Sequence, residues 1–352
     1  DTYEPGSTFK LITTAIALNE NVTNLESKYT CTGYITVGDA RLRCWRYYSP
    51  HGHQTLTEAV QNSCNPVFIQ LGLGVGKDKY YEYLNNFGFM DKTGIDLPGE
   101  SAAIIQNKSA IGPVELATIS YGQGISVTPI QLITAVSAIG NEGKLMKPRI
   151  VKELVDDDGN VIHRFEPEMI RQVISKETAN EMTLIMEQVV AEGTGKNAQV
   201  AGYRIGGKTG TADKVIDGRY VEGKVYSSFI ALAPIDDPKI AVLVIVDEPE
   251  GTHFGSLTAA PAAREILADS LRYLNIKQYY SQEELEKMKN EYVYVPDIRS
   301  KIRSEAILEL AEYGLGVEIV PEDEIDDFIV EDQYPKPGEL VRKNVSVYLY
   351  KN

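Results

Sequence analysis

The sequence predicts an α+β fold in which helices pack on an antiparallel sheet. Two apolar runs, residues 228–233 and 240–246, are separated by a turn at residues 236–238 (DDP), a pattern typical of a hairpin of buried strands. Helical patterns before and after these strands predict the layers that cover the sheet. They include residues 7–19, 56–63 and 260–274.

A second, smaller domain is predicted at the C-terminal end. The polar, charged stretch 281–290 ends the first pattern, and a new pattern starts at residue 292. It contains one predicted helix and three short strands, which are bounded by turn residues such as the PKPG segment. These elements cover residues 301–313, 317–320, 329–333 and 345–349. We therefore expect two domains, residues 1–280 and residues 290–352.

The charge of the chain limits its partners. Its 352 residues carry a formal net charge of −15 at pH 7, which repels nucleic acid and anionic membrane surfaces. No segment contains the roughly 18 to 20 consecutive apolar residues that cross a bilayer, and no charged-then-apolar leader opens the sequence. Because the chain enters its most informative motif almost at once, we expect it to be part of a longer protein.

The first candidate catalytic motif is the STFK sequence at residues 7–10. Pro5 and Gly6 lead into a predicted helix, so Ser7 lies at the helix N-terminus and Lys10 follows one turn later on the same face. A serine hydroxyl needs an adjacent base to act as a nucleophile, and N–H groups at a helix start can stabilise an oxyanion. Ser-x-x-Lys alone is a weak signal, because Ser7 could equally be a helix cap.

The second motif is Ser63, Cys64 and Asn65, which lies just before Pro66 at a predicted helix boundary. A hydroxyl at such a position can relay a proton toward a leaving group, and an amide can hold a substrate. The alternative is an ordinary polar end of a helix, so this motif alone indicates almost nothing.

The third motif is Lys208, Thr209, Gly210 and Thr211, at the start of the strand-rich region. Glycines on an edge strand let another backbone approach closely, so a substrate peptide can add itself by strand-type hydrogen bonds. Lys208 can hold a carboxylate, and the Thr211 N–H can donate to an oxyanion. The alternative is a solvated edge strand protected by a lysine.

Together the three motifs resemble the signature of penicillin-binding proteins and class A β-lactamases. Ser63 follows Ser7 by 56 residues, and Lys208 follows Ser63 by 145 residues. This spacing is similar to that of penicillin-binding transpeptidases. Four further stretches resemble the same family: residues 87–89, 93–100, 121–124 and 128–131. The C-terminal segment is similar to a PASTA domain. That pairing is identified with class B proteins of Gram-positive bacteria, and the sporulation-specific kind resembles this chain most.

The resemblance implies a penicillin-binding transpeptidase fold and an acyl-enzyme mechanism. Stem peptides that end in D-Ala-D-Ala would acylate Ser7 with loss of D-Ala, and transfer to a neighbouring amine would crosslink peptidoglycan. Lys10 would be the base, Ser63 the proton shuttle and Asn65 the group that binds the substrate amide. The substrate-binding strand would comprise Lys208, Thr209, Gly210 and Thr211. No cofactor is required for this chemistry.

The resemblance also implies partners and a location. β-Lactams would acylate the same serine, because they mimic the D-Ala-D-Ala end. Family members carry a membrane anchor, a pedestal domain and the first strands and helix of the transpeptidase domain, all of which we expect to precede residue 1 here. The whole protein would act on the extracytoplasmic face of the cell membrane with a glycosyltransferase partner, in spore cortex synthesis for the sporulation-specific kind.

Two other functions stay open at this point. A serine β-lactamase would share the motifs but hydrolyse the adduct. The deacylating Glu-x-x-x-Asn pattern of such enzymes is matched by Glu82 and Asn86, which we interpret as a chance match within a helix. A penicillin-binding sensor or scaffold would bind without turnover, although the intact motifs argue against a dead site.

All three cysteines and two of the four histidines lie close together in the sequence, around the second motif. Thiolate and imidazole are ligands that Zn²⁺ prefers, and four of them can close a tetrahedral structural site. The candidate metal ligands are Cys31, Cys44, His51 and His53, with Cys64 as a further candidate. A disulfide such as Cys44 with Cys64, or free thiols, are the alternatives. The neighbouring Trp45 is predicted either to line a substrate groove or to belong to the core.

Overall fold

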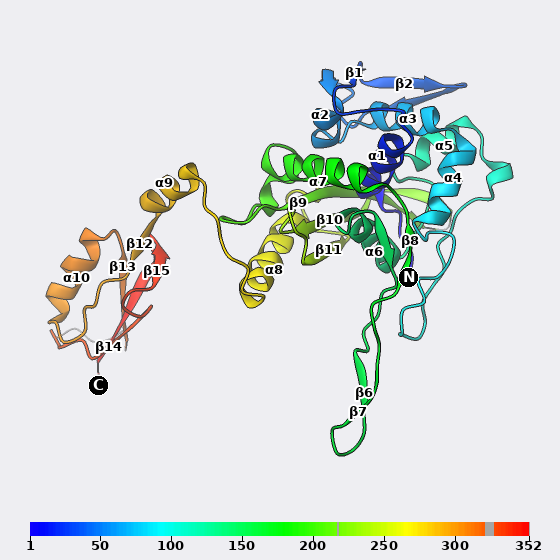
Figure 1. The fold of residues 1–352 in the computed structure, drawn as a ribbon. Coiled ribbons are helices and arrows are strands. Elements are labelled where there is room, and N and C mark those ends of the chain that lie inside the picture. The colour runs from blue at the N-terminus through cyan, green and yellow to red at the C-terminus, as the bar shows by residue number, and fades with distance from the viewer. Residues whose placement is uncertain (217, 321–326, 352) are drawn as a thin grey trace. The chain divides into compact units, whose positions relative to one another are not determined.

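The computed structural model describes residues 1–216, 218–320 and 327–351. The chain forms two compact units, Asp1–Lys277 and Gln278–Asn352 (Figure 1). The three candidate catalytic motifs all lie in the first unit.

The centre of the first unit is a three-stranded antiparallel sheet with the order β11-β10-β9. Its strands are β9 (Gly206–Ile216), β10 (Arg219–Ala233) and β11 (Ile240–Asp247). The predicted hairpin is confirmed, because β10 and β11 pair antiparallel with Phe229 opposite Val244. β9, which carries the third motif, has β10 on one side and forms one edge of this sheet.

The predicted packing of helices on the sheet is confirmed, and the structure shows that helices cover both of its faces. Alternate residues of β10 point to opposite faces, because side chains alternate along a strand. Phe229 and Ala231 pack with α8 (Ala259–Tyr273) in one buried cluster. Ile230 and Leu232 belong to a larger cluster on the other face. That cluster includes α1 (Lys10–Asn19), α6 (Pro129–Gly140) and α7 (Lys176–Ala191). Figure 1 shows α7 and α8 on opposite sides of the sheet.

A second layer of short elements surrounds α1. Its helices are α2 (Leu56–Gln61), α3 (Asn65–Val75), α4 (Lys77–Asn86) and α5 (Pro113–Ile119), with a short 3₁₀ turn at Lys108–Ala110. A further 3₁₀ turn, Lys196–Ala198, packs in the cluster that contains α8. Two small antiparallel pairs cap it: β1 (Lys28–Cys31) with β4 (Gly52–Thr55), and β2 (Tyr34–Val37) with β3 (Ala40–Arg43). These pairs place the cysteine-containing loops beside the second motif.

The first predicted helix, residues 7–19, is divided in the structure. A 3₁₀ turn, η1 (Gly6–Phe9), carries Ser7 and continues directly into α1 at Lys10. Such a turn is common at a helix N-terminus. The predicted helix at residues 56–63 is shorter than expected, because α2 ends at Gln61.

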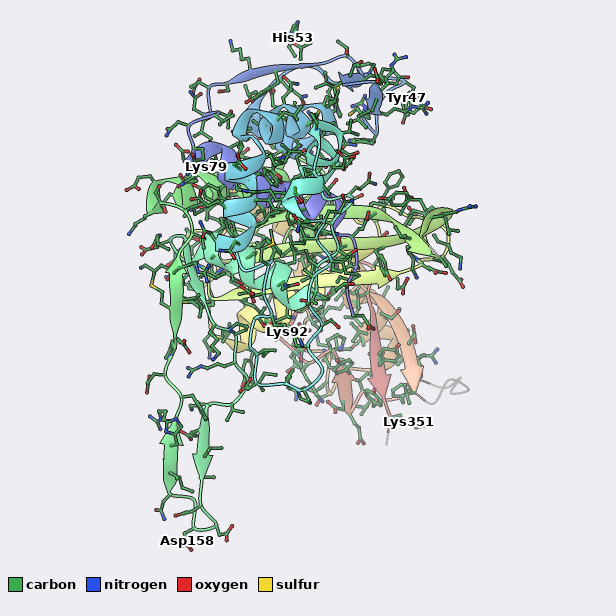
Figure 2. All side chains as sticks on the ribbon, turned by 90° about the vertical axis from the view of Figure 1, so that its right-hand side faces the viewer. Tyr47, His53, Lys79, Lys92, Asp158 and Lys351 are labelled. Carbon is green, nitrogen blue, oxygen red and sulfur yellow. The ribbon has the colours of Figure 1, made fainter. Side chains whose placement is uncertain are left out.

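A long hairpin extends from the base of this unit (Figures 1 and 2). Its stem is the pair β5 (Lys144–Met146) and β8 (Met169–Gln172), and its arm is β6 (Glu153–Val155) with β7 (Val161–Arg164). Asp158 lies at the tip of this arm in Figure 2.

Among the described helices of the chain, none combines the length and apolar character that a membrane crossing requires.

The second unit begins with α9 (Gln282–Glu291). In its described residues, a small mixed sheet and one further helix follow. The predicted helix is α10 (Arg303–Glu312). The sheet has the order β13-β16-β14, with β13 (Gly316–Val320) parallel to β16 (Ser346–Tyr350) and β14 (Asp332–Tyr334) antiparallel to it. A separate pair, β12 (Tyr292–Tyr294) with β15 (Leu340–Arg342), was not predicted. Three-residue strands are too short to show alternation in the sequence.

Candidate active site

The three sequence motifs meet at one cavity of about 500 Å³ beside β9. Each motif contributes side chains or backbone to its lining. The lining residues from the motifs are Ser7, Ser63, Asn65, Thr209, Gly210 and Thr211. The structure thus brings together groups from three segments that are far apart in the sequence.

Glycines allow the first and third motifs to lie in backbone contact. Gly6 has a positive φ of 53°, and a Cβ at this position would lie 2.7 Å from the carbonyl oxygen of Thr211. A Cβ on Gly210 would lie 2.3 Å from Ser228 Oγ and 3.1 Å from the carbonyl oxygen of Pro5. Side chains at either position would push η1 away from β9. The two glycines therefore allow the close contact between η1 and β9 beside the cavity.

The YGQG stretch at residues 121–124 supports η1 from the other side. The Gly6 N–H donates to the carbonyl of Gly122 at 3.0 Å, and the Gly124 N–H donates to Glu4 Oε1 at 3.0 Å. The hydroxyl of Tyr220, on β10, donates to the same carboxylate at 3.1 Å. Glu4 therefore connects the segment before Ser7 to both the loop and the sheet.

We predict that Gly122→Ala destabilises the domain and slows its reaction with β-lactams. Gly122 has φ +87°, and a Cβ there would lie 2.0 Å from the carbonyl oxygen of Gly6. The strain and the clash together should lower the free energy of unfolding by roughly 3 kcal/mol or more. Gly159→Ala is the matched control, with φ +83° and no heavy atom of the described residues within 4 Å of its Cβ position. It should cost about 1 to 2 kcal/mol in urea unfolding, and equal losses would contradict the interpretation.

Lys10 connects the first motif to the second. Its side chain is fully buried, and its Nζ donates to the Ser63 carbonyl at 2.9 Å, to Ser63 Oγ at 3.0 Å and to Asn65 Oδ1 at 2.6 Å. Within the described part of the chain, no hydrogen bond joins Lys10 to the Ser7 hydroxyl. Catalytic hydrogen bonds often form only when the substrate binds, so proton transfer from Ser7 to Lys10 is compatible with this arrangement.

The electrostatics of the site favour a neutral amine. Burial lowers the pKa of Lys10 to about 7, while negative charge on Cys64 and Cys44 acts in the opposite direction. Burial also lowers the pKa of Lys208 well below its usual range, and positive charge on Lys10 lowers it further. A lysine that loses its proton near neutral pH can accept one from a nucleophile.

Lys208, unlike Thr209, is not among the described residues that line the cavity. Its side chain is fully buried, and its Nζ donates to the Thr209 carbonyl at 3.1 Å. The Thr209 hydroxyl, which does reach the cavity, donates to Thr194 Oγ1 at 3.0 Å. Lys208 therefore acts on the cavity through its charge and through Thr209.

The second motif lies in a tight turn between two helices. Ser63 has a positive φ of 53°, and α3 starts at Asn65 with Pro66 in its first turn. The Cys64 N–H donates to the Ala59 carbonyl at 3.0 Å, which closes the end of α2. The turn directs both Ser63 and Asn65 toward Lys10.

The sequence analysis assigned no site role to the other residues of the cavity. They are Tyr121 and Gln123 of the YGQG loop, Thr194, and the segment Phe254, Gly255 and Ser256 that follows β11. A Cβ on Gly255 would lie 2.4 Å from the Ser228 carbonyl oxygen, so this loop is in close contact with the sheet. Gly255, which follows a buried strand, was the signal in the sequence that could have indicated this close contact. Trp45 lines the cavity and is 44% exposed, which supports the groove interpretation over the core.

The structure also gathers the cysteines, but with a different histidine set from the predicted one. Cys31, Cys44, His51 and Cys64 form a cluster in which the potential ligand atoms all lie within 4.8 Å of one another. His53 lies outside this cluster: it is exposed, and its Nδ1 is 2.9 Å from Thr30 Oγ1. The reason is the alternation along β4, which turns Gln54 inward and His53 outward, to the surface seen in Figure 2.

Comparisons with known sequences agree with this geometry. Residues 1–268 match the family model of the penicillin binding protein transpeptidase domain, and residues 293–352 match the PASTA domain. Stage V sporulation protein D of Bacillus subtilis is 51% identical over 284 residues, which are 80% of this chain and 44% of that protein. Penicillin-binding protein PbpB of Mycolicibacterium smegmatis is 33% identical over 287 residues, covering 78% of this chain and 44% of that protein. The chain thus spans less than half the length of these relatives.

Solved structures show the same fold. The transpeptidase domain of Burkholderia pseudomallei penicillin-binding protein 3 superposes with a TM-score of 0.71 at 32% identity, covering 80% of this chain and 82% of that one. Penicillin-binding protein 3 of Mycobacterium tuberculosis in complex with ampicillin gives 0.74 at 28% identity, with 80% and 64% coverage. The chain therefore belongs to the class B penicillin-binding proteins, with a transpeptidase domain followed by a PASTA domain.

Proposed function

We propose that the first unit is a D,D-transpeptidase that crosslinks peptidoglycan stem peptides through an acyl-enzyme on Ser7. The observation that supports this most is the meeting of the three motifs at one cavity, with Lys10 Nζ 3.0 Å from Ser63 Oγ. The activity of the relatives' named family supports the same reaction.

Acylation needs a base, a proton relay and a leaving group. Ser7 Oγ attacks the carbonyl carbon of the penultimate D-Ala, and the hydroxyl proton passes to the neutral amine of Lys10. Ser63 Oγ, which is hydrogen-bonded to Lys10 Nζ, can pass a proton on to the departing amine of the terminal D-Ala. The C–N bond then breaks, and the peptide remains as an ester on Ser7.

Backbone N–H groups are proposed to stabilise the tetrahedral intermediate. The N–H groups of Ser7 and Thr211 are the proposed oxyanion donors, because η1 and β9 are in contact on the same side of the cavity. The hydroxyls of Thr209 and Thr211 are the proposed partners of the substrate carboxylate. The edge of β9 would add main-chain hydrogen bonds to the peptide.

The second half-reaction distinguishes a transpeptidase from a β-lactamase. Fast hydrolysis needs a base that activates water, yet no Asp or Glu is among the residues of the described chain that line the cavity. Glu82, the chance match, lies on α4 and forms an exposed ion pair with Lys79. The acyl group is thus left for an amine of a neighbouring stem peptide, and a β-lactam adduct should be long-lived.

The intact mass of the protein after incubation with a β-lactam tests this proposal. We expect a stoichiometric adduct on the peptide that contains Ser7, with a lifetime much longer than the acylation step. Mycobacterium tuberculosis penicillin-binding protein 3 has been solved with ampicillin and with aztreonam, and both drugs are suitable probes. Rapid release of hydrolysed drug would favour the β-lactamase, and a lack of any adduct would contradict both enzymes.

We predict that acylation speeds up as pH rises through about 7. Lys10 must be neutral to accept the Ser7 proton, and its neutral fraction grows about tenfold per pH unit below the pKa. The second-order acylation rate should therefore level off above that pH. Burial is the main cause of this low pKa, and negative charge on Cys64 and Cys44 opposes it. A rate that stays flat between roughly pH 5 and 9 would show that Lys10 is not the base.

The whole protein is proposed to act in spore formation. The supporting observation is the 51% identity with stage V sporulation protein D, and spore cortex is the peptidoglycan that such a protein would crosslink. Peptidoglycan lies outside the cytoplasmic membrane, so an extracytoplasmic site follows. A membrane anchor in the full-length protein and a glycosyltransferase that supplies the glycan strands complete this proposal.

A further inference from the structure

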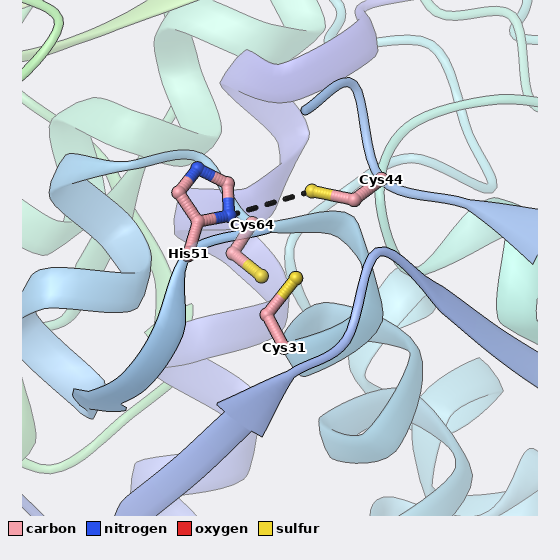
Figure 3. Close-up of side chains that lie close together, drawn as sticks. All are labelled: Cys31, Cys44, His51 and Cys64. Atoms are coloured by element: carbon pink, nitrogen blue, oxygen red, sulfur yellow. Dashed lines mark hydrogen bonds between the residues drawn. The ribbon is translucent and has the colours of Figure 1, made fainter. Parts of the chain in front are cut away.

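The cluster of Cys31, Cys44, His51 and Cys64 has no role in the reaction described above. Its three cysteines are at most 1% exposed, and all three thiols are free. Figure 3 shows the four side chains pointing toward a common centre, with His51 Nδ1 3.5 Å from Cys44 Sγ. His51 Nε2 is also buried, and it has no hydrogen-bond partner among the described residues. Such a collection of buried polar groups needs an explanation.

Four separate segments create the cluster. The antiparallel pairing of β1 with β4 sets Cys31 opposite Gly52, which brings His51 next to it. The Cys44 N–H donates to the Gly33 carbonyl at 2.9 Å, which holds the end of β3 against the end of β1. Cys64 comes from the turn between α2 and α3. The backbone therefore fixes all four positions without a disulfide between the cysteines.

The spacing suits a tetrahedral metal. Zn²⁺ binds sulfur at about 2.3 Å, so two sulfurs of a tetrahedral site lie about 3.8 Å apart, and three cysteines with one histidine form a known structural set. The ligand atoms here lie within 4.8 Å of one another, and movements of about 1 Å close the site. A disulfide would use only two of the three thiols and would leave the third thiol and the imidazole unpaired.

We propose that Cys31, Cys44, His51 and Cys64 bind one Zn²⁺ in a closed site, and that this metal fixes the second catalytic motif. All four ligands come from the protein, so no position is open for substrate and the metal is structural. Cys64 lies between Ser63 and Asn65, and both of those residues accept hydrogen bonds from Lys10. A bond from Cys64 to the metal holds the turn that aims them.

Cys44, a second proposed ligand, is connected to the cavity through the residues on either side of it. Asn65 Nδ2 donates to the Arg43 carbonyl at 3.2 Å, directly before Cys44. Trp45, directly after Cys44, lines the cavity, and its ring packs edge-on to His51 with 5.7 Å between centroids. Binding of Cys44 and Cys64 by one ion therefore supports a whole wall of the cavity, and the four ligands act as positioning residues.

Metal analysis of the untagged chain, purified under reducing conditions, is the first test. We expect about one zinc per chain in the wild type and in the His53→Ala control, and a loss of most of the zinc in Cys31→Ser. If Cys31→Ser does not fold, wild-type protein loaded with Co²⁺ serves instead, because thiolate ligands give it a charge-transfer absorption. Zinc-free wild type, a Cys44–Cys64 disulfide, or Co²⁺ without this absorption would each overturn the site.

The positioning role has its own readout. After a chelator removes zinc, the rate constant of acylation by ampicillin should fall at least about tenfold at a temperature where the protein stays folded by circular dichroism. Added zinc should restore it, with little change in the initial non-covalent affinity. Unchanged acylation in folded, metal-free protein would overturn the positioning role. The zinc content does not depend on the proposed transpeptidase activity, so the two proposals can fail separately.

Discussion

A Ser7→Ala variant should form no covalent adduct with ampicillin and should stay folded. Ser7 Oγ lines the cavity, and within the described chain it makes no hydrogen bond, so its removal should change the free energy of unfolding by less than about 1 kcal/mol. Loss of the nucleophile should lower the acylation rate by at least about ten-thousandfold. Intact-mass spectra over time measure the adduct, and urea unfolding measures the stability.

Ser256→Ala is the matched control for this variant. Ser256 is another serine that lines the cavity, on the loop after β11, and its backbone carbonyl accepts a hydrogen bond from Asn197 at 2.7 Å. Since that contact uses the backbone, the side chain can be shortened without affecting it. The control should keep most of its labelling. A Ser7→Ala protein that still forms the adduct would require a different nucleophile.

Lys10→Met should have the second largest effect. The thioether side chain fills a similar volume in the buried site but cannot accept a proton. Removing a general base typically costs about 10² to 10⁴-fold in rate, and we expect this loss in the acylation step. The carbonyl of Ser63 and the amide oxygen of Asn65 lose their donor, so the free energy of unfolding should fall by about 1 to 3 kcal/mol.

Lys77→Met separates this effect from a general loss of lysine packing. Lys77 starts α4 and donates to the Ile111 carbonyl at 3.2 Å, away from the cavity. The control should acylate like the wild type across the pH range, whereas Lys10→Met should also lose the rise near pH 7. If Lys10→Met acylates at the wild-type rate, the base is another group.

Long regular elements could be predicted from the sequence, whereas local turns could not. The hairpin of β10 and β11 follows from two apolar runs, and the helix α8 follows from a helical spacing of apolar residues. η1 and the turn at Ser63 depend on backbone angles that packing imposes. No local signal in the sequence shows that Ser63 has a positive φ of 53°.

The candidate site shows the same division. The meeting of Ser7 and Ser63 with the strand that carries Lys208 followed from a family pattern, because residues that are 56 and 145 positions apart have no local relation. Thr194 was missed, since a lone threonine in a loop carries no signal. Among the predicted metal ligands, His53 was included and Cys64 was only a further candidate. The sequence does not show which face of β4 turns inward.

The edge of β9 that borders the cavity has a consequence for how this protein could become resistant to a drug. If a β-lactam pairs with this strand as a peptide does, its hydrogen bonds go to main-chain groups of Thr209 and Thr211, and among point mutations only a change to proline removes such a donor. Selection for resistance would therefore have to act on the side chains around the entrance. Trp45 and Phe254 are exposed there, and their replacement would change the entrance while keeping the bonds that the natural peptide needs.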